Sequence, residues 1–120
     1  MKPARSGETG NDDPYAMIHV TFQTRTVDAA ERLAVQLMQR KLLLFPTMDT
    51  DHEELLFADG VLTRTSQLLL QGMSKALLYR ELERNAMELL GDDLVRMHAV
   101  PITNMDPEAQ RQLLEQTVQP

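Results

Sequence analysis

The chain has no cysteine and no tryptophan, and only five of its 120 residues are aromatic, two tyrosines and three phenylalanines. Without thiols it can form no disulfide and offers no thiolate nucleophile or thiolate metal ligand. Its core must therefore consist of aliphatic side chains and methionine, within a hydrophobic content of 42% that is ordinary for a globular domain. The length is enough for one domain with a core, and the absence of disulfides leads us to expect the cytoplasm.

Basic residues are also few, since 12 Lys and Arg stand against 18 Asp and Glu, which gives a formal charge of −6. No cluster of Lys and Arg reverses this sign locally. Because an acidic surface repels phosphate backbones, we expect no nucleic-acid partner. The sequence has neither the run of roughly 18 apolar residues that spans a membrane nor the apolar segment of a signal peptide, so we expect neither insertion nor secretion.

Residues 1–14 are rich in Gly, Pro, Asp, Asn and Ser and contain almost nothing apolar. Such a segment cannot offset the entropy lost on ordering, and we predict a disordered N-terminal tail over residues 1–14. The remaining residues, 15–120, are predicted to form the single domain.

Residues 15–24 alternate between apolar and polar side chains, which predicts a strand with one face on a core. A helix follows, beginning at Thr26 or Asp28, and Asp28 with Glu31 has the spacing of a capping box. The apolar residues of this helix recur at helical spacing along one stripe. They are Ala30, Leu33, Ala34, Leu37 and Met38.

A second strand is predicted over residues 42–48, and Pro46 places it at a sheet edge or gives it a bulge. The acidic segment 49–54 is expected to interrupt this strand as a loop. Pairing resumes at residues 55–57, and Asp59-Gly60 is a strong signal for a two-residue hairpin turn. A third strand is predicted over residues 61–71.

Ser74 is the expected N-cap of a second helix, and Gly91 is its expected end. The buried side of this helix is predicted to carry Leu78, Leu82, Ala86 and Leu89. Residues 94–102 read as a fourth strand. Asp106-Pro107 then supplies an N-cap and a proline at the first position of a short C-terminal helix.

The order of these elements is β-α-β-β-α-β plus a terminal helix, which predicts an α+β, ferredoxin-like (split β-α-β) fold with a four-stranded antiparallel sheet. Two helices cover one face of such a sheet. The other face is expected to lie uncovered in a single chain, and symmetric self-association is the usual way to cover it. The side chains expected there are Met17, His19, Thr21, Gln23, Gln67 and Leu69.

Several strings in this order resemble the CutA family of divalent-cation tolerance proteins over roughly residues 15–118. They are Phe22-Gln23-Thr24, Gln39-Arg40-Lys41-Leu42, the hairpin residues 56–61 with Gln67-Leu68-Leu69-Leu70, and Ala99-Val100-Pro101-Ile102. The resemblance implies a homotrimer whose long hairpins reach onto neighbouring subunits, and a fold shared with PII-type signalling proteins. It also implies a link to tolerance of copper and other divalent ions.

The chain departs from the family pattern at three places. Leu43 and Leu44 occupy the region where the family usually has a cysteine, and Leu56 and Phe57 replace paired tryptophans before the hairpin turn. Residues 90–94 replace a His-Pro-Tyr-Glu-like string. The residues that the family is proposed to use for copper therefore do not carry over to this chain.

His19 and His98 are the candidate metal ligands, because they lie on neighbouring strands of this fold and two imidazoles suit Zn²⁺ or Cu²⁺. The favoured alternative is that each ring donates to a Thr or Gln in an oligomer interface, since two ligands seldom suffice for a metal. The acidic segment 49–54 matches no calcium loop, and the scattered methionines are better explained as core residues than as a soft-metal site.

The sequence therefore predicts a CutA-like, trimeric, non-enzymatic protein with a regulatory, divalent-ion-tolerance or scaffolding role. One alternative is a PII-like sensor that binds a nucleotide or anion in the cleft between subunits, with Lys41, Arg64 and Arg96 as anion contacts. A second is a ferredoxin-like enzyme that uses the exposed sheet face as its pocket.

Overall fold

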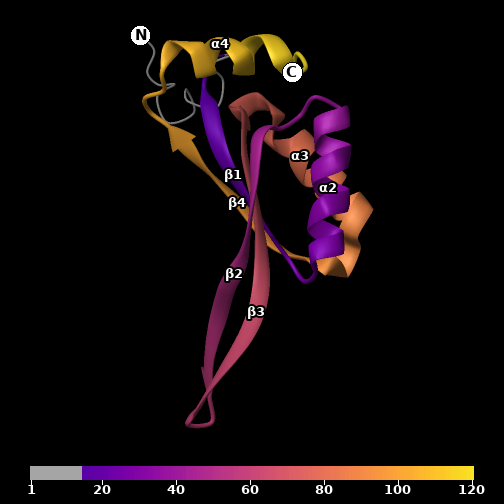
Figure 1. The fold of residues 1–120 in the computed structure, drawn as a ribbon, viewed down its shortest axis with the longest axis vertical. Coiled ribbons are helices and arrows are strands. Elements are labelled where there is room, and N and C mark those ends of the chain that lie inside the picture. Colours follow the sequence, from indigo (N-terminus) through magenta and orange to yellow (C-terminus); the bar gives the residue numbers. More distant parts are fainter. Residues whose placement is uncertain (1–14) are drawn as a thin grey trace, which may run out of the picture.

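The structure, a computed structural model, describes residues 15–120, so the predicted tail at residues 1–14 lies outside the described residues. Four strands form an antiparallel sheet in the order β2-β3-β1-β4 (Figure 1). The elements are β1 (Met17–Thr24), α2 (Val27–Gln39), β2 (Leu44–Ala58), β3 (Val61–Lys75), α3 (Tyr79–Leu90), β4 (Leu94–Ile102) and α4 (Pro107–Gln116). This order confirms the predicted ferredoxin-like class with its additional C-terminal helix.

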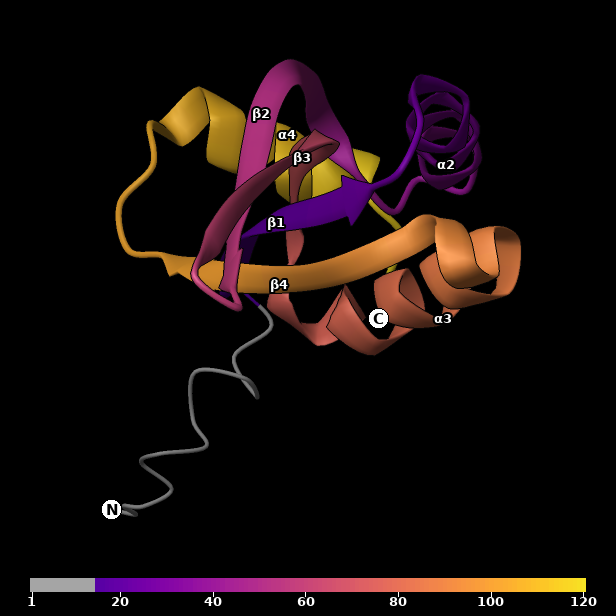
Figure 2. The ribbon, with the colours of Figure 1, turned by 90° about the horizontal axis from the view of Figure 1, so that it is seen from below.

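The core lies between the sheet and the helices α2 and α3, which pack side by side on one side of it (Figure 2). The inner strand β1 contributes Val20 and Phe22, neither of which has any exposed surface. The helices contribute residues such as Leu33 of α2 and Leu82 of α3, which are also fully buried. Phe22 is the one aromatic residue among the buried hydrophobic residues of the described chain, so the predicted aliphatic core is confirmed.

Helix α2 begins after Thr26, whose hydroxyl oxygen accepts a hydrogen bond from the backbone N–H of Ala29 at 3.1 Å. Thr26 has an extended backbone, as an N-cap residue should. Asp28 is therefore not the cap that its spacing to Glu31 suggested. It lies in the first turn of the helix, where its carboxylate pairs with Arg32 at 3.0 Å.

Strand β2 runs without a break from Leu44 to Ala58, so the prediction of an acidic loop at residues 49–54 was wrong. The strand absorbs this segment through two register shifts against β3, one between Leu44 and Thr47 and one between Asp49 and His52. At the second shift, Asp49 accepts a hydrogen bond from the backbone N–H of Asp51, which satisfies a donor that the ladder leaves free. β2 is an edge strand and Pro46 lies in its first irregularity, as predicted.

The β2–β3 hairpin turns at Asp59 and Gly60, which both have positive φ angles, 54° and 74°. Two such residues in succession form the type I′ turn that matches the twist of a hairpin, which confirms the predicted turn. The parts of these two 15-residue strands next to the turn project beyond the rest of the sheet, and the longest dimension of the molecule is 52 Å (Figure 1).

Ser74 does not cap the second helix, because β3 continues through it to Lys75. Its side chain is buried and its hydroxyl donates to the backbone oxygen of Leu42 at 2.8 Å. A single 3-10 turn at Ala76–Leu78 follows, and α3 then begins without a side-chain cap. Gly91 ends α3 with a φ of 53°, as predicted.

Helix α4 crosses the end of the sheet that lies opposite the hairpin (Figure 1). Asp106 caps it by accepting from the N–H of Ala109, and Pro107 occupies its first turn, which confirms the predicted start. Its far end is held by Lys75, whose ammonium donates to the backbone oxygens of Thr117 and Val118 at 3.2 and 3.0 Å.

The sheet face that points away from α2 and α3 is called the back face below. It was expected to lie uncovered in a single chain, and this was wrong in part. Met17, Thr21, Gln23 and Gln67 are buried, whereas His19 and Leu69 are half-buried. At least over Gln23, the reason is the long hairpin, which brings a side chain of β2 across the back face.

Candidate functional site

Three polar side chains from three different strands meet on the back face. The side-chain amide of Gln23 on β1 donates to Oε1 of Glu54 on β2 at 2.7 Å. The guanidinium of Arg96 on β4 donates to both carboxylate oxygens of Glu54, at 3.1 and 3.2 Å, and to Oε1 of Gln23 at 3.0 Å. We call these three residues the Glu54 cluster.

The Glu54 cluster exists because the hairpin bends across the sheet. Gln23 and Arg96 are direct partners in the β1–β4 ladder. Glu54 instead pairs with Thr65, which lies beyond the last residue of β3 that reaches β1. Only the twist of the paired strands β2 and β3 can bring the Glu54 carboxylate back over β1 and β4.

The electrostatics of the cluster are those of an ion pair between Glu54 and Arg96 in which Gln23 also donates to the carboxylate. The hydrogen bond from Arg96, followed by the one from Gln23, holds the pKa of Glu54 below its ordinary value. The same bond to Glu54 raises the pKa of Arg96. Glu54 is thus an ionised acceptor with a bidentate cation, an arrangement that fixes the position of the hairpin rather than one that transfers a proton.

Gln67 lies next to this cluster on β3, where it is paired with His52 of β2. Only 6% of the residue is exposed, and its side-chain oxygen is buried without a hydrogen-bond partner among residues 15–120. His52 is half-buried and close enough to Glu54 to favour its ionised form. The buried oxygen of Gln67 marks an unsatisfied acceptor in the back face.

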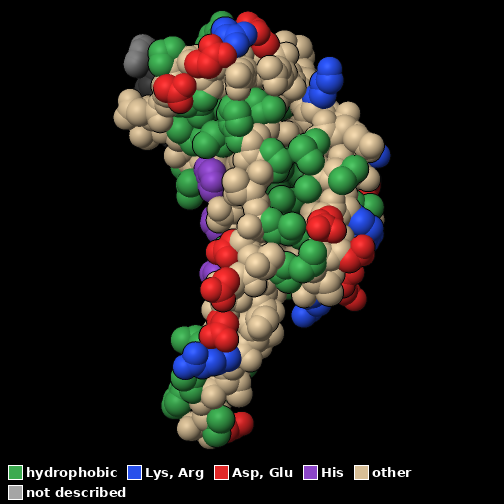
Figure 3. Space-filling view, viewed as in Figure 1, with side chains coloured by type: hydrophobic (Ala, Val, Ile, Leu, Met, Phe, Trp, Pro, Cys, Tyr) green, Lys and Arg blue, Asp and Glu red, His purple; other side chains and the backbone are tan. Residues whose placement is uncertain are grey.

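The candidate metal ligands His19 and His98 lie on the same face of neighbouring strands, as predicted, but they are not opposite one another. His98 is paired with Thr21, and His19 is paired with Val100, so the two rings are diagonal neighbours. Figure 3 shows histidines along one flank of the molecule, beside the acidic side chains of the hairpin. In the part of the chain that the structure describes, no three His, Cys, Asp or Glu side chains gather as a metal would require.

Two carboxylates of the hairpin form ion pairs, one within the hairpin and one with β4. Glu53 accepts from Arg64 at 3.2 Å, and Glu54 accepts from Arg96 as described. Lys41 lies at the other end of the molecule, where its backbone oxygen accepts from the N–H of Val118. The three anion contacts considered from the sequence, Lys41, Arg64 and Arg96, are therefore not brought together within one chain.

Sequence reasoning missed two features. One is the Glu54 cluster, whose members are far apart in the sequence and meet only because the hairpin twists. The other is a hollow of about 730 Å³ beside β4, on the helix-bearing side of the sheet, whose lining includes Tyr79 of α3. The lining also includes His98 but none of His19, Gln23 and Gln67, so it is not the pocket that an enzyme on the exposed sheet face would use.

The sheet order, the two helices on one face and the long hairpin define a ferredoxin-like α+β protein, and solved structures of CutA1 proteins share this fold. CutA1 from Oryza sativa superposes with a TM-score of 0.78 at 19% identity, over 88% of this chain and 96% of that one. The divalent cation tolerance protein (Cut A1) of Thermus thermophilus gives 0.75 at 18% identity, over 85% and 99% of the chains.

A third structure is that of the periplasmic divalent cation tolerance protein CutA from Archaeoglobus fulgidus. It gives a TM-score of 0.70 at 13% identity, over 83% of this chain and 97% of that one. No protein-family model and no curated protein sequence matches the chain. At these identities the likeness shows the fold.

Proposed function

We propose that this chain is a divergent CutA-like protein that acts without catalysis in tolerance of divalent ions, in a regulatory or scaffolding role. The observation that carries the proposal is the fold match, which spans 96–99% of the rice and Thermus CutA1 chains. The sequence strings shared with that family point in the same direction. The closed ion pairs of the hairpin fit a protein that positions surfaces rather than one that transforms a substrate.

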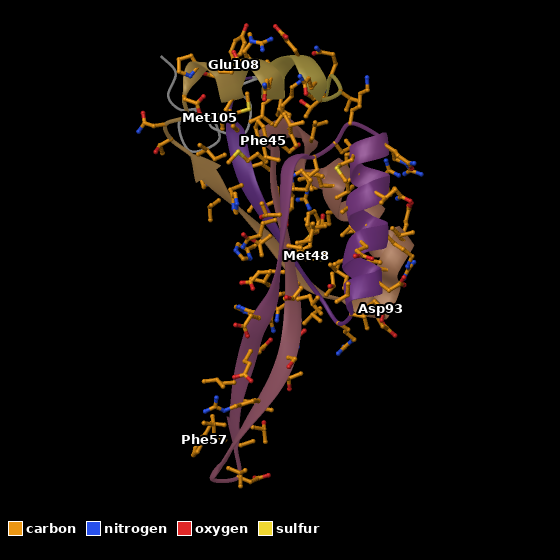
Figure 4. The ribbon with its side chains drawn as sticks, in the orientation of Figure 1. Phe45, Met48, Phe57, Asp93, Met105 and Glu108 are labelled. Atoms are coloured by element: carbon orange, nitrogen blue, oxygen red, sulfur yellow. The ribbon has the colours of Figure 1, made fainter. Side chains whose placement is uncertain are left out.

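Self-association as a homotrimer is part of this proposal. Five apolar residues near the hairpin tip are each more than half exposed, and Figure 4 shows Phe57 far from every helix. They are Leu55, Leu56, Phe57, Val61 and Leu62. A patch of this kind on a long hairpin usually serves as an interface.

The sheet edges support a closed ring. β2 and β4 are its two edge strands, and each lacks a partner on one side within residues 15–120. Phe45 and Met48 lie partly exposed along β2 (Figure 4). Because the two edges differ, pairing β2 of one copy with β4 of the next is a head-to-tail contact, which closes into a ring when the rotation allows it.

Phe57→Asp tests this proposal. It should reduce the assembly, measured by light scattering, from three times the 13.7 kDa chain mass toward the single chain. Met87→Asp is the matched control, since Met87 is a similarly exposed apolar residue on α3. A wild-type mass of one chain at micromolar concentration would refute the trimer.

For metal, we propose that His19 and His98 are the candidate contacts for copper or zinc and that such binding is weak. Two diagonal imidazoles form an incomplete ligand set for either ion. The role in ion tolerance is then indirect. Loss of copper tolerance in cells that lack the gene, restored equally by the wild type and by a His19→Ala, His98→Ala double variant, would support it.

The alternative is a PII-like sensor with a nucleotide or anion between subunits. Arg64 and Arg96 are already paired with Glu53 and Glu54, so such a ligand would have to displace these carboxylates. A rise in melting temperature with ATP that is absent in Arg64→Ala would favour this alternative.

We propose the cytoplasm as the compartment. None of the helices in residues 15–120 is long and apolar enough to span a membrane. Fractionation of cells that express the tagged full chain tests the compartment directly, and the periplasm is the competing result.

A further inference from the structure

The hollow beside β4 lies where the chain passes from β3 into α3. β3 continues to Lys75, a 3-10 turn follows at Ala76–Leu78, and Ala76, Leu77, Tyr79 and Arg80 from this passage all line the hollow. Ile18 of β1 and Met97 and Ala99 of β4 form the floor of the hollow, and Leu77 contributes to its wall. Its volume of about 730 Å³ is within the range of small-molecule sites.

The chemistry of the hollow is unusual for so acidic a chain. Six of its nine lining residues are apolar and none carries a carboxylate, although the chain has a formal charge of −6. The charged residue of the lining is Arg80 at the start of α3. A single cation beside an apolar floor, itself paired with Glu83, suits a ligand that carries negative charge at one end only and that displaces this carboxylate from Arg80.

Two lining side chains at the start of α3, Tyr79 and Arg80, can donate hydrogen bonds. Arg80 makes one ion pair, to Glu83 at 3.2 Å, and its side chain is 90% exposed, which leaves it free to turn toward a ligand. The hydroxyl of Tyr79 has no hydrogen-bond partner among residues 15–120. Burial, followed by the charge of Glu83, raises the pKa of Tyr79, so the hydroxyl remains protonated and able to donate.

We propose that this hollow binds a small amphipathic anion, with an alkyl or aryl body on Ile18, Met97 and Ala99 and a single carboxylate held by Arg80 and Tyr79. Medium-chain fatty acids and aromatic acids belong to this class. The lining includes His98, one of the two candidate metal contacts, but decanoate binding is measured without metal, so the site is tested separately from the proposed ion-tolerance function.

The probe for the test is decanoate, used below its micelle concentration with the full chain. Amide ¹H–¹⁵N spectra should show saturable shifts confined to Ile18 and to residues 76–80 and 97–100. Arg80→Ala should weaken binding about tenfold, the loss expected for one charge-assisted hydrogen bond. Ala99→Leu, which fills the floor, should weaken it at least as much.

Each variant has a matched control. Arg84→Ala removes a similar charge one turn further along α3, where Arg84 pairs with Glu81. Val100→Leu enlarges the next residue of β4, which is half exposed on the back face. Both should bind decanoate within about twofold of the wild type, a difference too small for a lost contact. Melting temperatures establish that every variant folds.

Three results would overturn the proposal. The first is a decanoate titration that leaves these amide resonances unmoved, and the second is equal weakening of binding by Arg84→Ala and Arg80→Ala. The third is a wild type that does not bind decanoate together with an Ala99→Leu variant whose assembly mass differs from that of the wild type, which would show that a neighbouring chain fills the hollow. A monomeric wild type that binds decanoate would refute the trimer and leave this site intact.

Discussion

Gln67 is a buried polar residue whose environment within one chain does not satisfy its hydrogen-bonding groups. Its side-chain oxygen is buried in the back face without a donor from residues 15–120, although its neighbours on the same face include amides and an imidazole. A buried acceptor that lost its water and gained no partner destabilises the folded state by about 1–3 kcal/mol. The polar identity of this residue is therefore not explained by the stability of one chain.

Replacing Gln67 with leucine should raise the free energy of unfolding by about 1 kcal/mol, because it removes the unsatisfied oxygen and keeps a similar volume. Urea unfolding measures the change. Gln71→Leu, on the same strand and face but only half-buried, is the control and should change it less. A loss of stability in Gln67→Leu would show that the oxygen finds its donor in the assembled protein.

Glu54 should make the position of the hairpin depend on pH. Its pKa is lowered in the folded state, so its contribution is present above the ordinary value of 4.5 and is lost as the pH falls through the lower, folded value. The side-chain amide resonance of Gln23 should therefore shift in acid. In Glu54→Gln this shift should be absent, and its persistence would mean that another carboxylate controls the hairpin.

At the scale of elements, the sequence predicted those structures whose signals are local. The alternation in residues 15–24, the Asp59-Gly60 turn, the Gly91 helix end and the Asp106-Pro107 helix start all appear in the structure. The prediction from sequence was wrong where pairing with a strand distant in sequence outweighed the local preference of the residues for a loop. Six polar residues at 49–54 resemble a loop, yet β3 holds them in β2.

The predicted role of Ser74 was wrong, and the Glu54 cluster was not predicted, for the same reason: both depend on contacts between residues far apart in the sequence. A serine before an apolar stripe is a good N-cap by itself, but its hydroxyl found the backbone of Leu42, which is distant in sequence. The Gln23–Glu54–Arg96 contacts depend on the twist of the hairpin, which no spacing rule encodes. His19 and His98 could be placed on one face from alternation, but their diagonal register required the structure.

The attachment of α4 should depend on Lys75. Its ammonium is buried and bound by two backbone oxygens at the end of the helix, and Lys75→Met would remove both bonds. We expect a loss of about 1–2 kcal/mol in the free energy of unfolding. In Lys75→Met, amide hydrogen exchange should become faster in α4 than in the wild type and change less in α2, which would locate the loss of stability at α4. Lys41→Met, at an exposed lysine, is the control, and an equal loss there would contradict the assignment.

At the scale of the whole molecule, the proposed role in ion tolerance does not rest on a tight metal site in this chain. Calorimetry with copper or zinc should find no binding tighter than about micromolar, since two imidazoles make an incomplete ligand set. His19→Ala and His98→Ala should change the titration little. A stoichiometric, submicromolar site that either variant abolishes would restore a direct metal-binding role.

The position of β1 in the sheet has a consequence for how the chain is made. β1 is synthesised before the other three strands of the sheet and is one of the two inner strands of the finished sheet, yet both of its partners, β3 and β4, lie in the second half of the sequence. Val20 and Phe22, which are fully buried in the folded protein, must therefore remain exposed in the nascent chain until β3 and β4 have been synthesised. Slowing translation before residue 61 should prolong this interval and increase the dependence of the yield on holding chaperones.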